Sequence, residues 1–512
     1  MSRVNNSMKN LVASTGGEVL TILLKFITRS VFIKTLGTQY LGINGLFTNI
    51  LSMLALAELG VGSAIIFDLY KPIAQNNKKK INQLMNLYRK TYRIIGLVVA
   101  ALGVCLIPFL PYIIKDDVSF INVNAIFLLF LMQNVSTYLF FAYKSAIIKA
   151  HQKEYISTII GYYFSIVTNI MQIIILVVFN NFTLYILTVV VFNILKNLFI
   201  ALKSDKMFPY IKEKSDDILP KEERKHIFKN TFAIFIYKVN GVVVNATDNI
   251  ILSIFIGLRI IGIYSNYLLI ISVIKTMLNK FYNAIAASLG DLHASDDVEN
   301  EHKIFKVVNF FTMCSYGLAS IGTFVVANNF ITLWIGEEFV LSQAFAFLVA
   351  TEIYIFGLQK TLATFRTAMG LFQQAKYRPV FGIIINLGIS ILLVQYIGIY
   401  GVLIGTISSS LLTYMWFDPY IIYKHVFKRS VKEYYLTNIK YVLVIIIAGG
   451  LSYYLSSLIN LDGVIFIIIQ TLICFIVTGL IIFILYKNKP EFRYILNLIN
   501  KMFLKAKLKI NK

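Results

Sequence analysis

Residues 36–43 of this 512-residue chain read LGTQYLGI, and residues 256–263 read IGLRIIGI. The two stretches align at an offset of 220 positions, which pairs Gly37 with Gly257 and Gly42 with Gly262. Each stretch joins two long apolar runs at a turn. Such short matches also arise by chance, because glycine is common in tight turns. A true repeat of parallel halves would predict a two-lobed helical bundle with a binding site between the lobes.

Long apolar runs extend outward from both turns to the ends of the chain. The sequence is 58% hydrophobic and only 14% charged, whereas soluble domains carry roughly 25% charged residues. Runs of about 20 apolar residues predict membrane-spanning helices, because lipid leaves backbone amides no partner outside a helix. We predict an all-α polytopic membrane protein with about 14 spans: 10–33, 41–67, 94–114, 120–142, 156–179, 183–202, 231–256, 260–283, 307–329, 341–363, 379–397, 401–418, 441–459 and 464–486.

The basic residues are distributed unevenly between the predicted loops. With both termini on the same side, 38 of the 48 Lys and Arg fall on that side, and only Lys34, Lys115 and Arg259 lie in loops on the other. This asymmetry predicts that both termini are cytoplasmic, because cytoplasmic loops collect Lys and Arg. The net charge of +23 therefore indicates a membrane orientation rather than nucleic-acid binding. The first apolar run lacks a cleavage site and is expected to remain as the first helix.

The repeat and the spans together predict five parts. Spans 7–12 repeat spans 1–6, spans 13 and 14 are appended, and the basic tail places Phe492, Ile495, Ile499, Met502 and Phe503 at helical spacing. Such a tail is expected on an anionic membrane surface. The predicted parts are an amino-terminal lobe (1–202), a basic inter-lobe loop (203–230), a carboxy-terminal lobe (231–418), the appended spans (419–486) and the tail (487–512).

Charged residues inside the spans mark the candidate site. An ion near the centre of a membrane helix costs roughly 2.5–3.5 kcal/mol on insertion scales. Glu18, Lys25 and Arg29 share one face of span 1, because they lie within about 40° of one another around a helix. Lys238 and Asp248 lie in span 7, the counterpart of span 1.

Further charges lie in three other spans: Glu58 in span 2, Lys275 in span 8 and Glu352 in span 10. The acids predict either ion coupling or structural pairing between helices. The basic residues Lys25, Arg29, Lys238 and Lys275 predict a water-filled cationic cavity that binds an anion, since Lys and Arg suit phosphate oxygens. Internal ion pairs are the alternative interpretation.

No motif for a nucleotide-driven pump, a metal or a cofactor is evident. The chain has no GxxxxGK[ST] loop, and its three cysteines, Cys105, Cys314 and Cys474, all fall in apolar runs. We therefore expect neither a cofactor nor a metal site, and we expect no enzymatic activity.

Several runs resemble bacterial polysaccharide flippases of the Wzx type, in the superfamily that also holds multidrug exporters and lipid II flippases. They are IKTLGTQYLGINGLF at 33–47 within a longer match from Phe26 to Tyr70, TDNIILSIFIG at 247–257, GIYSNY at 262–267, FRTAMGLFQQAKYRP at 365–379 and GVLIGT at 401–406. The resemblance implies alternating access between two six-helix lobes. It also implies that the substrate is an undecaprenyl-diphosphate-linked oligosaccharide, used for capsule or exopolysaccharide synthesis in a bacterial cytoplasmic membrane. Other membrane proteins of that synthesis are implied as partners. Members of the family use a basic residue in span 1, and Arg29 and Lys25 match that role here.

Other functions remain open at this point. A lipid II or teichoic-acid precursor flippase would differ only in the sugar. A multidrug exporter of the same superfamily should have an acidic cavity, whereas basic residues predominate here. A membrane polymerase or ligase would need an outer active site, but all five histidines lie in predicted cytoplasmic loops and only Glu337 and Glu338 stand in an outer turn.

Overall fold

Every regular element of the chain is a helix in the part that the structure describes. The computed structural model describes residues 2–58, 61–212, 219–294, 297–371, 374–375, 377–498 and 500. The all-α class predicted from the sequence is confirmed.

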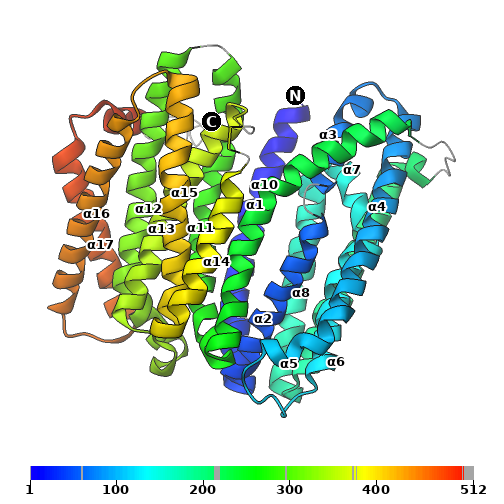
Figure 1. Cartoon of the computed structure of the whole chain (residues 1–512), viewed down its shortest axis with the longest axis horizontal. Helices are drawn as coiled ribbons and strands as arrows, with labels where there is room; N and C mark the ends of the chain where they lie inside the picture. The colour runs from blue at the N-terminus through cyan, green and yellow to red at the C-terminus, as the bar shows by residue number, and fades with distance from the viewer. Residues whose placement is uncertain are drawn as a thin grey trace, which may run out of the picture. The chain divides into compact units, whose positions relative to one another are not determined.

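The chain divides into two compact units, Met1–Gly262 and Ile263–Lys512. Within each unit the long helices run side by side (Figure 1). The helices of the first unit are α1 (Ser2–Leu36), α2 (Thr38–Leu54), η1 (Ala55–Glu58), α3 (Val61–Ala74), α4 (Lys78–Leu106), η2 (Ile107–Phe109), α5 (Leu110–Ile113), α6 (Val123–Leu139), η3 (Ala142–Lys144), α7 (Ser145–Ala150), α8 (Glu154–Phe179), α9 (Phe182–Met207), η4 (Pro209–Lys212) and α10 (Lys221–Phe255).

Helix α11 (Leu258–Ala294) begins in the last residues of the first unit and continues into the second. The second unit then contains α12 (Val298–Ile335), η5 (Glu337–Phe339), α13 (Gln343–Ala368), α14 (Arg378–Ile397), α15 (Ile399–Ile422), the π-helical turn η6 (Tyr423–Phe427), α16 (Lys432–Ser457) and α17 (Gly463–Tyr486). Helix α10 belongs to the first unit because it packs against α2 and α3. The predicted lobes, 1–202 and 231–418, are defined by the internal repeat of the sequence, whereas the two units are defined by helix packing. The lobes therefore stay a prediction.

All fourteen predicted spans coincide with helices. Among the described residues, ten helices are long and apolar enough to cross a membrane, and Val123–Leu139 and Gly241–Phe255 are shorter apolar helices. The first predicted span is α1. The second, 41–67, is not one continuous helix: α2 ends at Leu54, a 3₁₀ turn reaches Glu58, and α3 begins at Val61.

Short polar side chains begin several of the helices. The Asn77, Asn122 and Asn181 side chains accept hydrogen bonds at 2.9–3.0 Å from backbone amides three residues further on. Asp297 does the same for α12. These caps satisfy amide groups that the first helical turn leaves without a partner, and they fix where each of these helices begins.

The two repeated glycine turns contact each other inside the first unit. Gly37 and Gly257 have φ angles of +85° and +132°, a region that favours glycine. A Cβ atom on Gly42 would lie 2.1 Å from the carbonyl oxygen of Leu258. A Cβ atom on Gly262 would lie 2.4 Å from the carbonyl oxygen of Thr38. The contact is reciprocal, because Leu258 lies four residues before Gly262 and Thr38 lies four residues before Gly42.

The segment after α5 covers the second of these turns. Lys115 Nζ donates to the Phe255 carbonyl at 2.8 Å, where α10 ends. The Asp116 carboxylate accepts a hydrogen bond from the Leu258 amide, where α11 begins. A cation at a helix carboxyl end and an anion at an amino end both complement the helix dipoles.

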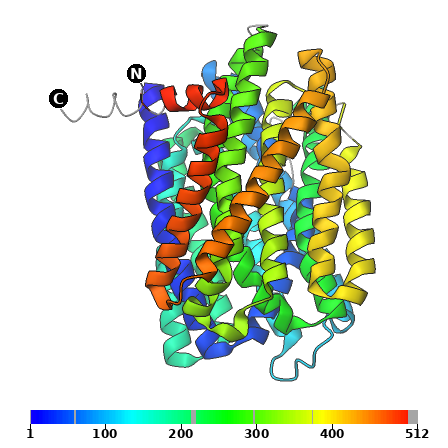
Figure 2. The ribbon, with the colours of Figure 1, turned by 90° about the vertical axis from the view of Figure 1, so that its left-hand side faces the viewer.

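The last two spans pack on α12 within the second unit. Phe310 and Met313 of α12 form one buried cluster with Tyr441 of α16 and Ile482 of α17. The chain after α17 forms a short helix at 490–498, drawn in red, that lies across the end of α17 (Figure 2). Its Phe492 and Ile495 pack against this cluster rather than facing away from the protein. Of the other predicted tail positions, Ile499, Met502 and Phe503 lie outside the described residues.

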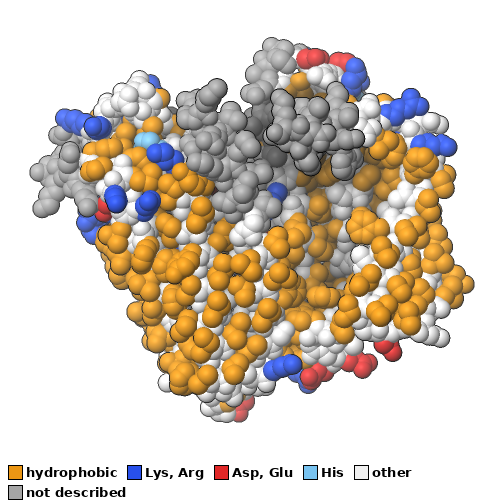
Figure 3. Space-filling model, turned by 180° about the vertical axis from the view of Figure 1, so that it is seen from behind, with side chains coloured by type: hydrophobic (Ala, Val, Ile, Leu, Met, Phe, Trp, Pro, Cys, Tyr) orange, Lys and Arg blue, Asp and Glu red, His pale blue; other side chains and the backbone are white. Residues whose placement is uncertain are grey.

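The surface has the pattern expected of a membrane protein. Hydrophobic side chains cover the middle of the visible face as a band, and most of the visible Lys and Arg lie beyond one edge of it (Figure 3). A multi-pass fold needs such a band, because the side chains in the hydrocarbon region meet lipid.

We predict that Gly42→Ala destabilises the protein. The added methyl group would meet backbone atoms, which cannot rotate away as a side chain can, and overpacking of this kind costs about 1–3 kcal/mol. Thermal unfolding of the purified protein in detergent should show a lower Tm. The control is Gly161→Ala, because a Cβ at Gly161 in α8 would meet nothing within 4 Å. Equal Tm values for both variants would contradict a tight contact at Gly42.

Candidate functional site

Helix α1 packs along α8 through small and polar side chains. Thr28 Oγ1 donates to Asn169 Oδ1 at 3.1 Å, and both side chains are buried. A Cβ on Gly17 would overlap the ring of Tyr162, so this glycine lets the two helices approach. Small residues and side-chain hydrogen bonds hold helices together in membranes, where the lipid is as apolar as the side chains. The packed face of α1 fixes the direction of its charged face.

The charged face of α1 lies beside this packed stripe. Glu18 interacts with Tyr162 of α8. Arg29 is half-buried and interacts with Tyr185 of α9. Lys25, between them, is exposed, and within the described part of the chain it has no hydrogen bond or ion pair. In the predicted span 1, a lysine could face lipid only at a high cost in free energy, so we expect its amine to meet water or a ligand.

Glu58 lies at the break in span 2 and is held by tyrosines. The Tyr92 hydroxyl donates to Glu58 Oε1, and the Tyr88 hydroxyl donates to that of Tyr92 at 3.2 Å. Tyr138 of α6 also interacts with the Glu58 carboxylate. All three tyrosines are buried. The sequence singled out Glu58, but it could not select these three rings among 31 tyrosines.

Asp248 is buried in α10 together with Thr247, Asn249 and Ser253. Helix α10 packs against α2 and α3, so these polar side chains lie within the first unit. The side chain of Lys238, the other charge predicted in span 7, lies outside the described residues. The structure therefore describes the side chain of Asp248, the predicted acid of span 7, but not the side chain of Lys238, the predicted cation.

Lys275 and Glu352 form an ion pair inside the second unit. Lys275 Nζ of α11 lies 2.8 Å from Glu352 Oε1 of α13. It also lies 4.5 Å from the ring centre of Phe356, one turn further along α13, a cation–π distance. Both side chains are largely buried, with 19% and 13% exposed. The sequence named both residues, but it did not bring them together.

A second cluster of buried charges was not predicted. In the sequence, Arg366 and Arg378 fall in the loop between two predicted spans. Arg378 donates to Asp418 of α15, and Arg366 Nε lies 3.7 Å from the same carboxylate. The Arg378 guanidinium stacks 3.9 Å from the ring centre of Tyr414. The ends of α13, α14 and α15 converge here, so the charges lie at a helix junction. Only the family-like run at 365–379 marks this region in the sequence.

An apolar groove of about 440 Å³ lies between α11, α12 and α17. Its walls carry side chains such as Ile274, Met277, Leu318, Phe330 and Phe475. Few polar groups line it, and all of them are hydroxyls or thiols (Ser315, Thr323, Thr471 and Cys474). Such a lining suits a hydrocarbon chain.

The features lie in separate units: the charged face of α1 in the first and the apolar groove in the second. In the described part of the chain, no group of three or more His, Cys, Asp or Glu side chains is placed to hold a metal ion. The other charges include the Lys275–Glu352 pair and the cluster of Arg366, Arg378 and Asp418. A cation can bind an anion, and an apolar groove can take an apolar chain.

Comparison with known proteins places the fold. No protein-family model matches the chain, and neither does any curated protein. Among solved structures, the lipid II flippase MurJ in its inward closed conformation matches with a TM-score of 0.65 at 15% identity, covering 92% of this chain and 98% of MurJ. An inward-facing multidrug resistance MATE family transporter of the MOP superfamily gives 0.60 at 13% identity, covering 78% and 94%. A mutant of the Vibrio cholerae MATE transporter VcmN gives 0.57 at 13% identity, covering 84% and 100%.

These matches show that the chain has the fold of MOP-superfamily membrane proteins. At such low identity they show the fold alone. The substrate must therefore be argued from the residues themselves.

We predict that a double-variant experiment will separate pairing from binding at Lys275. Lys275→Met leaves Glu352 as an uncompensated buried charge and should lower the stability by about 3 kcal/mol, whereas Lys275→Met with Glu352→Met should restore most of it. Thermal unfolding in detergent measures both. If the pair is purely structural, the double variant also recovers the activity of the wild type; if Lys275 binds a ligand, that activity stays lost. A double variant no more stable than the single one would contradict the pairing.

Proposed function

We propose that this protein flips an undecaprenyl-diphosphate-linked oligosaccharide repeat unit across a bacterial cytoplasmic membrane, for capsule or exopolysaccharide synthesis. The observation that carries the proposal is the charged face of α1. Lys25 is exposed within a span and has no ion-pair partner among the described residues, and Arg29 lies one turn further on. Two cations at membrane depth favour a diphosphate, because charge-assisted hydrogen bonds to phosphate are strong.

The rest of the proposed substrate also has matching features. A polyprenyl chain is apolar, and the groove between α11, α12 and α17 is lined almost entirely by apolar side chains. The resemblance to Wzx-type flippases at 26–70 and 247–267 supports the same class of substrate. The MOP-superfamily fold is compatible with alternating access between two repeats around one site. We take the lobes to be spans 1–6 and 7–12.

The proposed direction of transport needs no nucleotide. We place both termini in the cytoplasm, because the basic loops lie on that side. With the inside negative, moving an anion outward is favourable by about 2.3 kcal/mol per charge per 100 mV. A diphosphate would gain roughly twice that amount if fully translocated. The membrane potential therefore supplies a driving force for export.

A lipid II or teichoic-acid precursor flippase is the second candidate. It is compatible with the fold, which is similar to that of the lipid II flippase MurJ. The diphosphate and the prenyl chain would be the same, so only the sugar distinguishes the two candidates. A drug exporter fits less well, since Lys25 and Arg29 would repel the cations that such a cavity should favour. A polymerase or ligase would need acids outside the membrane, where Glu337 and Glu338 of η5 offer only a short turn.

We predict that Arg29→Ala and Lys25→Ala each slow flipping about tenfold or more, because each removes a charge-assisted contact worth about 1.5–3 kcal/mol. The assay is flipping of a fluorescent undecaprenyl-diphosphate oligosaccharide in proteoliposomes. Lys34→Ala, in the last turn of the same helix, is the matched control and should flip normally. Normal flipping by both cavity variants would remove α1 as the phosphate site while leaving the function standing.

We further infer that one of the span acids couples flipping to an ion gradient. Glu18, Glu58, Asp248 and Glu352 are each neutralised to the corresponding amide, and flipping is measured with and without an imposed proton or sodium gradient. The gradient response should vanish in at least one variant, because a neutral side chain no longer takes up the ion. Glu337→Gln in η5 is the control. A full response in all four variants would discard ion coupling through these residues.

A further inference from the structure

A second cavity lies in the second unit, away from the apolar groove. It has a volume of about 300 Å³ and is formed by α12, the π-helical turn η6, α16 and the segment that follows α17. Aromatic side chains form part of its wall, contributed by Phe305, Tyr423, Tyr434, Tyr441 and Tyr486. This size falls at the lower end of the range for small-molecule sites.

Three lysines stand around the cavity, and two of them have no acidic partner. Lys306 of α12 is ion-paired with Glu433 of α16. Lys440 and Lys489 also line the cavity, and in the described ranges neither side chain has a hydrogen bond or ion pair. Glu491, the other acid of the lining, lies near Tyr441.

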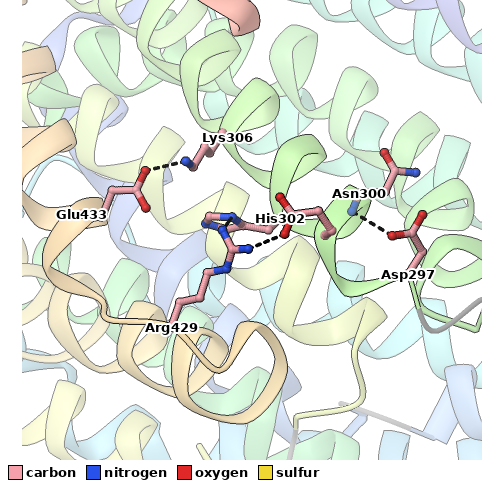
Figure 4. A network of polar contacts seen from close by, with 7 residues as sticks. Asp297, Asn300, His302, Lys306, Arg429 and Glu433 are labelled. Atoms are coloured by element: carbon pink, nitrogen blue, oxygen red, sulfur yellow. Dashed lines mark hydrogen bonds and ion pairs between the residues drawn. The ribbon is translucent and has the colours of Figure 1, made fainter.

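A network of polar contacts fixes the paired lysine and its helix. Lys306 and Glu433 point toward each other from α12 and the start of α16 (Figure 4). Beside them, Arg429 binds Glu299 and contacts His302 Nδ1 at 3.0 Å. These contacts hold η6 and the start of α16 against α12. They link two of the elements that form the wall of the cavity.

Two residues of the lining, Asn309 and Tyr434, each carry a buried polar atom without a partner in the described structure. Asn309 is 4% and Tyr434 3% exposed, and the atoms are Asn309 Oδ1 and the Tyr434 hydroxyl oxygen. A buried polar group without a hydrogen bond costs about 1–3 kcal/mol, and such groups are rare in folded proteins. Once its side chain turns toward the cavity, the Tyr434 hydroxyl can donate to a phosphate oxygen and Asn309 Oδ1 can accept from a hydroxyl. The cavity thus offers two lysines without an acidic partner among the described residues, with a donor and an acceptor beside them.

The surroundings of the cavity are apolar. Tyr441 belongs to the buried cluster with Phe310, Met313 and Ile482, on which Phe492 and Ile495 also pack. Large apolar side chains are exposed further along both helices, Leu443 on α16 and Phe483 on α17 among them. A ligand with a charged head and apolar tails would satisfy both parts of this surface.

We propose that this cavity binds the headgroup of an anionic phospholipid. Lys440 and Lys489 contact the phosphodiester, the Tyr434 hydroxyl donates to one of its oxygens, and Asn309 accepts from a headgroup hydroxyl. The acyl chains lie along the exposed apolar side chains of α16 and α17. The proposed orientation assigns this lipid to the cytoplasmic leaflet, but the site itself does not depend on which substrate is flipped. The bound lipid would join the appended helices to the rest of the second unit.

The test is native mass spectrometry of the full-length protein in detergent, titrated with phosphatidylglycerol or phosphatidylcholine. The wild type should bind phosphatidylglycerol more tightly than phosphatidylcholine. Lys440→Gln with Lys489→Gln should weaken phosphatidylglycerol binding about tenfold, because it removes both charge-assisted contacts. Lys440→Arg with Lys489→Arg keeps the charge and should retain binding, and the Gln variant should keep the thermal unfolding temperature of the wild type, which together assign the loss to the missing charge.

The matched control is Lys432→Gln with Lys487→Gln. It removes the same charge from α16 and from the segment after α17, but neither residue lines the cavity. Its phosphatidylglycerol affinity should equal that of the wild type. A loss equal to that of the cavity variant, or equal binding of both lipids by the wild type, would overturn the site.

A third arm distinguishes a lipid from a soluble phosphate compound. Glycerol phosphate and inorganic phosphate are added as competitors, and neither should displace phosphatidylglycerol at equal concentration, because neither has apolar chains. Displacement by either one would overturn the lipid assignment. The readout is binding without flipping. A protein that binds the lipid but fails to flip the proposed substrate would therefore overturn only the proposed function.

Discussion

The close approach of two backbones at the repeated glycine turns constrains the whole first unit. Gly42 meets the carbonyl of Leu258, and Gly262 meets that of Thr38, so each copy of the turn presses its backbone on the other. These contacts leave no room for a side chain on either glycine. They fix where α2 and α11 begin, and with them the packing of α10 against α2 and α3. The capping of the second turn by Lys115 and Asp116 follows from the same placement.

The second organising constraint is the cost of charge in a membrane. The fold reduces this cost in three ways: by pairing Lys275 with Glu352, by gathering Arg366 and Arg378 around Asp418, and by surrounding Glu58 with tyrosine hydroxyls. Each solution buries the charge with a partner, as a low dielectric requires. Lys25 is treated differently, since no partner in the described structure compensates it. That contrast is why α1, rather than another charged helix, supports the proposed function.

The sequence predicted the helices well and the side-chain partners poorly, for physical reasons. Apolar runs reveal helices directly, because lipid allows few other structures, and all fourteen runs correspond to helices. Which charges meet depends on helix packing, which the sequence does not encode locally. Lys275 and Glu352 are 77 positions apart, and Asp418 ends a predicted span while its arginine partners lie in a predicted loop. Hydrophobicity alone also missed the break at Glu58, because residues on both sides of it are apolar.

That break has a consequence for the boundary between the protein and the bilayer. A 3₁₀ turn pairs backbone groups three residues apart instead of four. The regular hydrogen-bond pattern of an α-helix is therefore interrupted at η1, between α2 and α3. Hydrocarbon tolerates irregular backbone only where protein or water covers it. The face of span 2 that carries Glu58 is therefore closed to annular lipid. We expect lipid to contact the protein along its uninterrupted helices instead, and the prenyl chain of the proposed substrate to enter past those helices.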